Sequence, residues 1–214
     1  MEPRHRAIAK IALSAAGTHG FALAGGYAIR EHGMGQRPSG DVDLFTDWHQ
    51  RADFQAAVEA VMAALTNVGY SVTTAASGDT FARLLVTSPG PDRAEDKLEM
   101  AADWRAHPPV LLDIGPVLHP DDAVANKMCA LYGRALPRDF LDIEAAITVG
   151  RYTREHLLEL AANADSGFTP ALFADALGVL TQITDDAFRQ YDIPDTHITA
   201  LRHHFSDWRQ KLQP

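Results

Sequence analysis

The stretch that decides the fold is Phe21-Ala-Leu-Ala-Gly-Gly-Tyr-Ala-Ile-Arg30, followed closely by Arg37-Pro-Ser-Gly-Asp-Val-Asp-Leu-Phe45. It predicts a short buried strand, a double glycine, a short helix, a turn and a second strand. The double glycine (Gly25 and Gly26) allows close approach to the backbone, and the N–H groups that open the next helix can bind an anion. The two aspartates of the second strand are two positions apart, so both side chains project from one face.

These aspartates, Asp41 and Asp43, need a cation between them, and a third carboxylate is expected on a neighbouring strand. Residues 97–102 alternate between apolar and polar, which makes Glu99 the preferred candidate, with Asp113 on the following strand as its competitor. The Ser39 hydroxyl could bind a terminal phosphate, although a serine is also an ordinary turn residue here. Phosphate-binding backbone beside paired carboxylates is typical of phosphoryl or nucleotidyl transfer with Mg²⁺ or Mn²⁺.

Composition excludes several classes of protein. The chain has 214 residues, of which 46% are hydrophobic and 22% charged, as in globular proteins. No apolar run approaches the ~20 residues of a membrane span, so no membrane association is expected. A single cysteine excludes an internal disulfide framework and favours a cytoplasmic location. The net charge of −9 argues against general coating of nucleic acid, but it allows a local basic groove.

Periodicity predicts an α+β chain with a boundary near residue 118. The part before the boundary is expected to be mixed, with helices over 5–17, 27–33 and 53–68 and strands over 21–24, 41–46, 70–75, 81–87, 97–102 and 110–114. The part after it is expected to be all helical, over 121–133, 138–149, 153–165, 169–180, 185–191 and 196–212.

Two charged residues of the helical part stand out. Lys127 falls within the apolar stripe of helix 121–133, and Asp142 lies at the edge of the buried face of helix 138–149. The lysine could snorkel to water, or it could point its ammonium into a cleft toward a carboxylate or a triphosphate. The two side chains could pair across adjacent helices as part of the active site. The alternative is an ion pair with a purely structural role.

Three motifs follow one another in the chain: Leu-Ala-Gly-Gly-Tyr-Ala, then Arg-Pro-Ser-Gly-Asp-Val-Asp-Leu-Phe and, after Lys127, Gly133-Arg-Ala-Leu-Pro-Arg-Asp-Phe-Leu-Asp142. Together they resemble the AbiEii/MenT-type nucleotidyltransferase toxins. The resemblance covers roughly residues 5–150. It implies a DNA-polymerase-β-like core over 1–118, a mixed sheet flanked by helices, and a helical domain over 119–214 that contributes to the active-site cleft. It also implies a cognate antitoxin protein as partner.

The resemblance further implies transfer of a nucleotide, a pyrimidine nucleotide in the better understood relatives, from an NTP to the 3′ end of tRNA, with Mg²⁺ and release of pyrophosphate. Asp41 and Asp43 would be metal ligands, with Glu99 where a typical member has an aspartate. Lys127 would neutralise the triphosphate and Asp142 would orient Lys127 or the nucleotide. The nucleotide would be held by Gly25, Gly26, Ser39, Arg30 and Arg138.

Two other functions remain open from the sequence. The same core could modify a small molecule or a protein, which the acidic net charge favours, or the chain could be a catalytically weak nucleotide-binding partner. In favour of an RNA acceptor, four arginines in or beside the motifs could form a positive rim: Arg30, Arg37, Arg134 and Arg138.

Overall fold

The computed structural model describes residues 1–91 and 93–213, and the chain divides into two compact units. The first unit comprises residues 1–31 and 39–119, and the second comprises residues 32–38 and 120–214. The chain therefore leaves the first unit after Glu31 and returns to it at Ser39. Nothing in the sequence indicated that the segment 32–38 belongs with the helical part. Of the predicted helical domain, Pro214 lies outside the described residues.

Within the described residues, the first unit is built on a mixed seven-stranded sheet in the order β3-β4-β5-β2-β1-β7-β6. β2 pairs in parallel with β5, and β1 in parallel with β7, whereas the other neighbours are antiparallel. The strands are β1 (Ala22–Leu23), β2 (Asp41–Asp47), β3 (Ser71–Ser77), β4 (Phe81–Thr87), β5 (Glu95–Asp103), β6 (Val110–Leu112) and β7 (Gly115–Val117).

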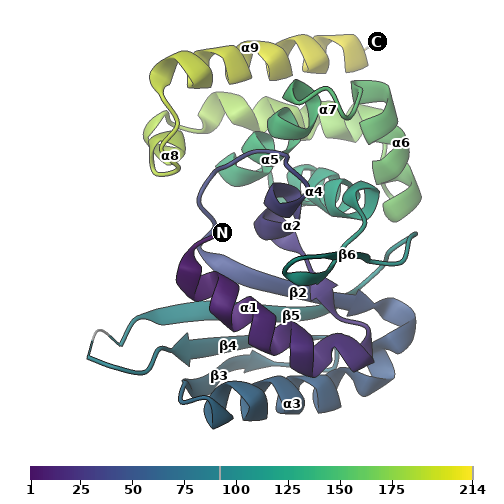
Figure 1. The fold of residues 1–214 in the computed structure, drawn as a ribbon. Helices are drawn as coiled ribbons and strands as arrows, with labels where there is room; N and C mark the ends of the chain where they lie inside the picture. The colour runs from purple at the N-terminus through teal and green to yellow at the C-terminus, as the bar shows by residue number, and fades with distance from the viewer. Residues whose placement is uncertain (92, 214) are drawn as a thin grey trace. The chain divides into compact units, whose positions relative to one another are not determined.

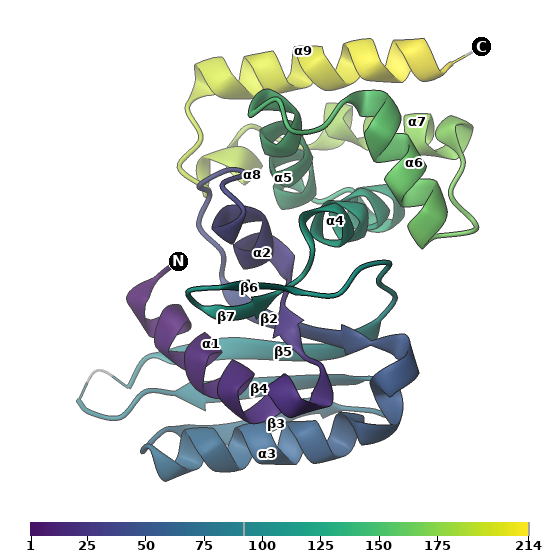
Figure 2. The same ribbon diagram turned by 45° about the vertical axis from the view of Figure 1, so that its right-hand side comes forward.

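Helices cover both faces of this sheet. α1 (Pro3–Ala16) and α3 (Phe54–Asn67) pack against each other on one face, as Figure 1 shows. α2 (Gly25–Glu31) lies beside β2 on the other face (Figure 2). Two 3-10 helices, η1 (Gly17–His19) and η2 (Trp48–Asp53), lead from α1 to β1 and from β2 to α3.

The register of the central strands is set by burial. Val42 and Leu44 of β2 and Leu98 of β5 are fully buried, while Asp41 and Asp43 are half-buried on the other face. Burying each large apolar side chain is worth about 1.5–3 kcal/mol. Because a slip of one residue would turn every apolar side chain of a strand outward, this pattern fixes the face on which the acidic residues lie.

Two predicted elements of the first unit were wrong in detail. The strand predicted over 110–114 is a hairpin, because Gly115 adopts a φ of 126°, which lets the chain reverse direction and add β7. The helix predicted to begin at Tyr27 begins at Gly25. The Ala28 amide donates to the Ala24 carbonyl at 3.1 Å, and this hydrogen bond closes a first turn that contains both glycines.

The second unit contains helices packed around an aromatic core. They are α4 (Pro120–Arg134), α5 (Pro137–Thr148), α6 (Arg154–Ala164), α7 (Pro170–Gly178), η3 (Val179–Gln182), α8 (Asp186–Arg189) and α9 (Asp195–Leu212). The rings of Phe140 and Phe205 meet edge to face at 5.1 Å between centroids, and those of Phe173 and Trp208 at 5.2 Å. No helix among the described residues has the length and hydropathy of a membrane span.

Candidate functional site

Three carboxylates come together on the polar face of the sheet. Asp43 of β2 lies directly opposite Glu99 of β5 in the parallel register. One oxygen from each of Asp41, Asp43 and Glu99 lies within 4.8 Å of the others. The competing candidate, Asp113, lies in the exposed turn between β6 and β7 and is not part of this group.

The chemistry of the donors fits a hard divalent cation. Mg²⁺ and Mn²⁺ prefer oxygen ligands, and carboxylates held this close repel one another unless a cation lies between them. Glu99 also has a protein partner that the sequence did not reveal, because the Arg83 guanidinium on β4 contacts its Oε1 at 2.8 Å. Since 44% of the Arg83 side chain is exposed, this contact is weak and can give way.

The position of the Asp43 side chain leaves no room for a side chain at residue 25, which is why a glycine is needed there. A Cβ built on Gly25 would lie 1.8 Å from Asp43 Oδ2, and the residue has a φ of 59°. The Asp43 carbonyl also accepts a hydrogen bond of 2.8 Å from the Ala24 amide. The group that approaches the glycine backbone closely is therefore the carboxylate of Asp43, which the absence of a side chain at Gly25 holds in place.

Ser39 is buried beside the acidic group. Only 7% of it is exposed, its hydroxyl donates to Asp41 Oδ1 at 3.2 Å, and its carbonyl accepts from the Tyr27 hydroxyl at 3.2 Å. Tyr27 is in turn hydrogen-bonded to His5 Nδ1 at 2.6 Å, and His5 Nε2 lies 3.0 Å from Asp96. Burial raises the pKa of Tyr27, which keeps its hydroxyl protonated as a donor to Ser39.

The second unit holds a separate charged cluster. The Lys127 ammonium on α4 lies 2.9 Å from Asp142 Oδ2 on α5. Arg37, from the segment 32–38, makes a bidentate contact with the same carboxylate, with both N–O distances at 2.7 Å. The exposed fractions of these side chains are 8% for Lys127 and Arg37 and 3% for Asp142. Both cations therefore neutralise one buried carboxylate.

Two cations determine the ionisation of Asp142. Although burial alone would raise its pKa, the charge of Lys127 and the hydrogen bonds from Arg37 hold the pKa of Asp142 below its usual range. Burial would likewise lower the pKa of Arg37, but its hydrogen bonds with Asp142 raise that pKa above the ordinary value. The two cations and one carboxylate thus leave the cluster with one net positive charge. The Arg37 guanidinium also lies 5.6 Å from the centre of the Tyr191 ring.

The predicted arginine rim is wrong for Arg37, whose side chain is buried against Asp142. Arg134 is partly exposed, but it makes two contacts of 3.0 Å with the fully buried Asp139, which stabilises the start of α5. Arg30, in the last turn of α2, and Arg138, on α5, are half-buried. The sequence shows these four arginines only as cations near a motif, and it does not reveal which carboxylates they pair with in the fold.

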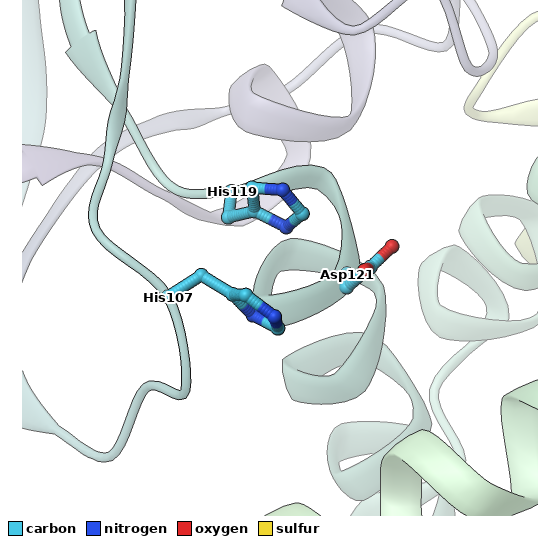
Figure 3. Close-up of side chains that lie close together, drawn as sticks. All are labelled: His107, His119 and Asp121. Atoms are coloured by element: carbon cyan, nitrogen blue, oxygen red, sulfur yellow. The ribbon is translucent and has the colours of Figure 1, made fainter.

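A pair of histidines was also not singled out from the sequence. The rings of His107 and His119 stack at 4.3 Å between centroids with an interplanar angle of 23° (Figure 3). Asp121, also labelled in Figure 3, belongs to the second unit, where its carboxylate accepts a hydrogen bond of 2.6 Å from the Tyr152 hydroxyl. Burial and this hydrogen bond raise the pKa of Tyr152.

A family model described as the nucleotidyl transferase AbiEii toxin of type IV toxin–antitoxin systems matches residues 7–211. The chain belongs to the AbiEii nucleotidyltransferase toxin family. This assignment confirms the resemblance that the sequence motifs indicated, and it makes the protein a nucleotidyltransferase toxin, an enzyme whose family implies an antitoxin partner.

Solved structures share the fold of this AbiEii-family toxin. JHP933 from Helicobacter pylori has a TM-score of 0.61 at 17% identity, with 98% of this chain and 92% of that chain covered. A putative nucleotidyltransferase from H. pylori has a TM-score of 0.61 at 15% identity, covering 98% and 93%. MenT4, a nucleotidyltransferase toxin from Mycobacterium tuberculosis H37Rv, has a TM-score of 0.52 at 18% identity, covering 99% and 93%.

At these identities the likeness concerns the fold, and it confirms the predicted α+β class with a mixed sheet flanked by helices. No curated protein matches the AbiEii-family chain significantly.

Proposed function

We propose that this AbiEii-family toxin transfers a nucleoside monophosphate from a pyrimidine NTP to the 3′ end of tRNA and releases pyrophosphate. The observation that carries the proposal is the group of Asp41, Asp43 and Glu99 on adjacent strands, whose oxygens lie within 4.8 Å of one another. In a family of nucleotidyltransferases, this is the arrangement expected for metal-dependent transfer to a hydroxyl.

The residues of the first unit have distinct roles in this proposal. Asp41, Asp43 and Glu99 would hold Mg²⁺ or Mn²⁺, which when bound lowers the pKa of the acceptor hydroxyl and neutralises charge on the triphosphate. Ser39 holds Asp41 in position through its hydroxyl at 3.2 Å. Gly26 and the N–H groups at the start of α2 bind triphosphate oxygens, because backbone donors at a helix start favour anions.

The residues of the second unit act on the leaving group. Lys127 stabilises the negative charge that develops on the departing pyrophosphate, because its ammonium is a compact point charge. Asp142 fixes the ammonium of Lys127, and Arg37 holds Asp142 through both carboxylate oxygens. Arg30 and Arg138 supply further positive charge for the nucleotide.

A second candidate acceptor is a small molecule or a protein. The specific observation in its favour is that Arg37 and Arg134 are engaged with buried carboxylates, in a chain whose net charge is −9. Less positive charge is therefore available for an RNA backbone than the sequence indicated.

The test is transfer of label. The purified protein is incubated with each α-labelled NTP, Mg²⁺ and total RNA from a bacterium, and the labelled product is identified by size and by release of label with a 3′ exonuclease. We expect label from CTP or UTP at the 3′ end of tRNA, and none after chelation of the metal. Label on a protein or a small molecule, with tRNA unlabelled, would favour the second candidate.

Variants connect this activity to the carboxylate group. Asp41→Asn, Asp43→Asn and Glu99→Gln should each abolish transfer in a folded protein, whereas Asp113→Asn should leave it unchanged because Asp113 lies outside the group. Transfer that survives Asp41→Asn at near-normal rate would remove the metal site from the proposal.

A further inference from the structure

The second unit contains a pocket that the proposed reaction does not use. It has a volume of about 380 Å³ and lies between α9 and the end of α7 with η3. α7 and α9 pack against each other and lie side by side in Figures 1 and 2. This volume is within the range of small-molecule sites, about 300–1,000 Å³. Its walls combine two leucines with hydroxyl and guanidinium groups: Leu177, Gly178, Leu180, Thr181, Arg202, Ser206 and Arg209.

The two arginines of the pocket differ in how they are paired. Arg202 donates to the carbonyls of Leu180 and Ile183 and to the Asp185 carboxylate, each at 2.6 Å, so its charge and donors are used within the fold. Arg209 makes no ion pair within residues 1–91 and 93–213, and its buried Nε has no hydrogen-bond partner there. One positive charge of the pocket therefore has no counterion in the described chain.

Gly178 leaves room for the Arg209 guanidinium. A Cβ built on Gly178 would lie 3.0 Å from Arg209 Cζ, 3.1 Å from Nη2 and 3.2 Å from Nε, so the guanidinium covers this glycine. The φ of Gly178 is −61°, which any residue can adopt. A glycine in a helix costs about 0.5–1 kcal/mol relative to alanine. Since the backbone does not require a glycine here, the space for Arg209 is what it provides.

A guanidinium without a counterion can recognise an oxyanion, since its planar donors match carboxylate and phosphate. Ser206 lies one turn before Arg209 on the same helix and is exposed, so its hydroxyl can donate to the same anion. Leu177 and Leu180 line the same pocket and, being 2% and 4% exposed, offer a small apolar area in it. The combination suits a molecule with one anionic group and an apolar or aromatic body.

We propose that this pocket binds a small organic oxyanion, with its phosphate or carboxylate on Arg209 and its body against Leu177 and Leu180. A ligand in this position would join α9 to the end of α7 and η3 and stabilise the second unit. The site is independent of nucleotidyl transfer, because none of its lining residues belongs to the carboxylate group or to the Lys127 cluster.

The test uses phenyl phosphate, benzoate and inorganic phosphate as probes, without divalent metal, followed by calorimetry and by the thermal midpoint of unfolding. We expect saturable binding of phenyl phosphate or benzoate that raises the midpoint, since a ligand of the folded state alone stabilises it. Inorganic phosphate should bind more weakly because it lacks the apolar body. The stronger of the two aromatic probes identifies the preferred anionic group.

Two variants test the site, and one variant serves as control. Arg209→Gln should weaken binding at least tenfold by removing the charge, and Gly178→Ala should weaken it less, because its Cβ displaces the flexible guanidinium by only a few tenths of an ångström. Arg189→Gln, which removes an exposed arginine paired with Asp195 outside the pocket, should leave binding unchanged. Absence of saturable binding, or binding that survives Arg209→Gln in a folded protein, would overturn the proposal.

Discussion

A single glycine decides where one of the acidic side chains lies. The Asp43 carboxylate occupies the space in which any side chain at position 25 would begin. A glycine beside a phosphate-type site is usually explained by the ligand, but here the close neighbour is a carboxylate of the protein itself. The Gly-Gly motif and the Asp-x-Asp motif are therefore parts of one packing arrangement, since the second motif needs the first in order to fit.

Gly25→Ala should reduce transfer by roughly 100-fold, the scale expected when a catalytic group is displaced by about an ångström. The new Cβ would lie 1.8 Å from Asp43 Oδ2, so the carboxylate has to move. The matched control is Gly33→Ala. Gly33 also has a positive φ, of 77°, but no atom within 4 Å of an added Cβ.

Both substitutions place alanine in the left-handed region, at a cost of about 1–2 kcal/mol each. The backbone cost is therefore common to both, Gly25→Ala adds the displacement of Asp43, and the two should differ most in activity, as measured by chemical denaturation and by label incorporation. Equal activity of the two variants would show that the position of Asp43 is not what Gly25 provides.

Asp142→Asn should destabilise the protein by roughly 3–5 kcal/mol at neutral pH, because it leaves two buried cations against a neutral amide. Both cations have side chains that are only 8% exposed. Unfolding by denaturant at pH 7 measures the loss. The cost should be partly relieved by adding Arg37→Met, which removes one of the two unpaired charges.

The same residue predicts part of the acid sensitivity. The pKa of Asp142 is lower in the folded protein than in the unfolded chain, so its contribution to stability is complete above the unfolded pKa, near 4. That contribution is lost as pH falls toward the folded pKa. Asp142→Asn should therefore show a shallower fall in unfolding free energy below pH 4 than wild type does, and an unchanged slope would contradict this ionisation.

At the scale of elements, the segment 32–38 differs from its sequence prediction, which is the end of a helix at residue 33 followed by a turn. It belongs to the helical unit although both neighbours in sequence belong to the first unit. Met34 is 1% exposed, and a Cβ on Gly35 would lie 2.9 Å from the Ala145 Cβ, so the middle of the segment is packed against the helical unit. Arg37 fixes its end through Asp142.

Arg37→Lys should loosen this segment. Lysine is a point donor and cannot reproduce the bidentate contact, so we expect a loss of about 1.5–3 kcal/mol, typical of hydrogen bonds to a charged group. Hydrogen exchange of the amides in 32–38 should accelerate. Arg154→Lys, which alters a different ion pair of the same unit, should not affect these amides. If exchange in 32–38 is the same in both variants, Arg37 does not hold the segment.

What the sequence could predict followed from local periodicity. Alternation in β2 and β5 predicted that Asp41, Asp43 and Glu99 face away from the core, and the structure has them together. The Lys127–Asp142 pair was one of the alternatives that helix spacing allowed, and it is present. Local patterns do not reveal which distant groups meet, so the Arg37–Asp142 and Arg83–Glu99 contacts, and β7, were found only in the structure.

At the scale of the whole molecule, charge and proposed acceptor pull in opposite directions. The net charge is −9, and Arg37 and Arg134 are already paired with buried carboxylates. Of the four arginines in or beside the motifs, we assign the phosphate contacts of an RNA substrate to the half-buried Arg30 and Arg138. With two contacts, each worth about −0.9 in the slope of log affinity against log salt, a fourfold rise in salt should weaken RNA binding by roughly tenfold.

We therefore predict a modest but measurable salt effect that is specific to RNA. Raising salt fourfold should reduce labelling of tRNA by roughly tenfold at subsaturating RNA, the loss expected for two phosphate contacts. Use of free NTP should change much less, because metal coordination anchors the triphosphate. Arg30→Gln with Arg138→Gln should flatten the remaining salt dependence and, because both arginines also serve the nucleotide in the proposed function, should raise the KM for NTP as well, whereas Arg51→Gln, on η2, should do neither. A steeper dependence that survives the double substitution would place the RNA contacts on other cations of the chain. Labelling that is indifferent to salt would instead favour a small-molecule or protein acceptor, which makes few or no phosphate contacts with the toxin.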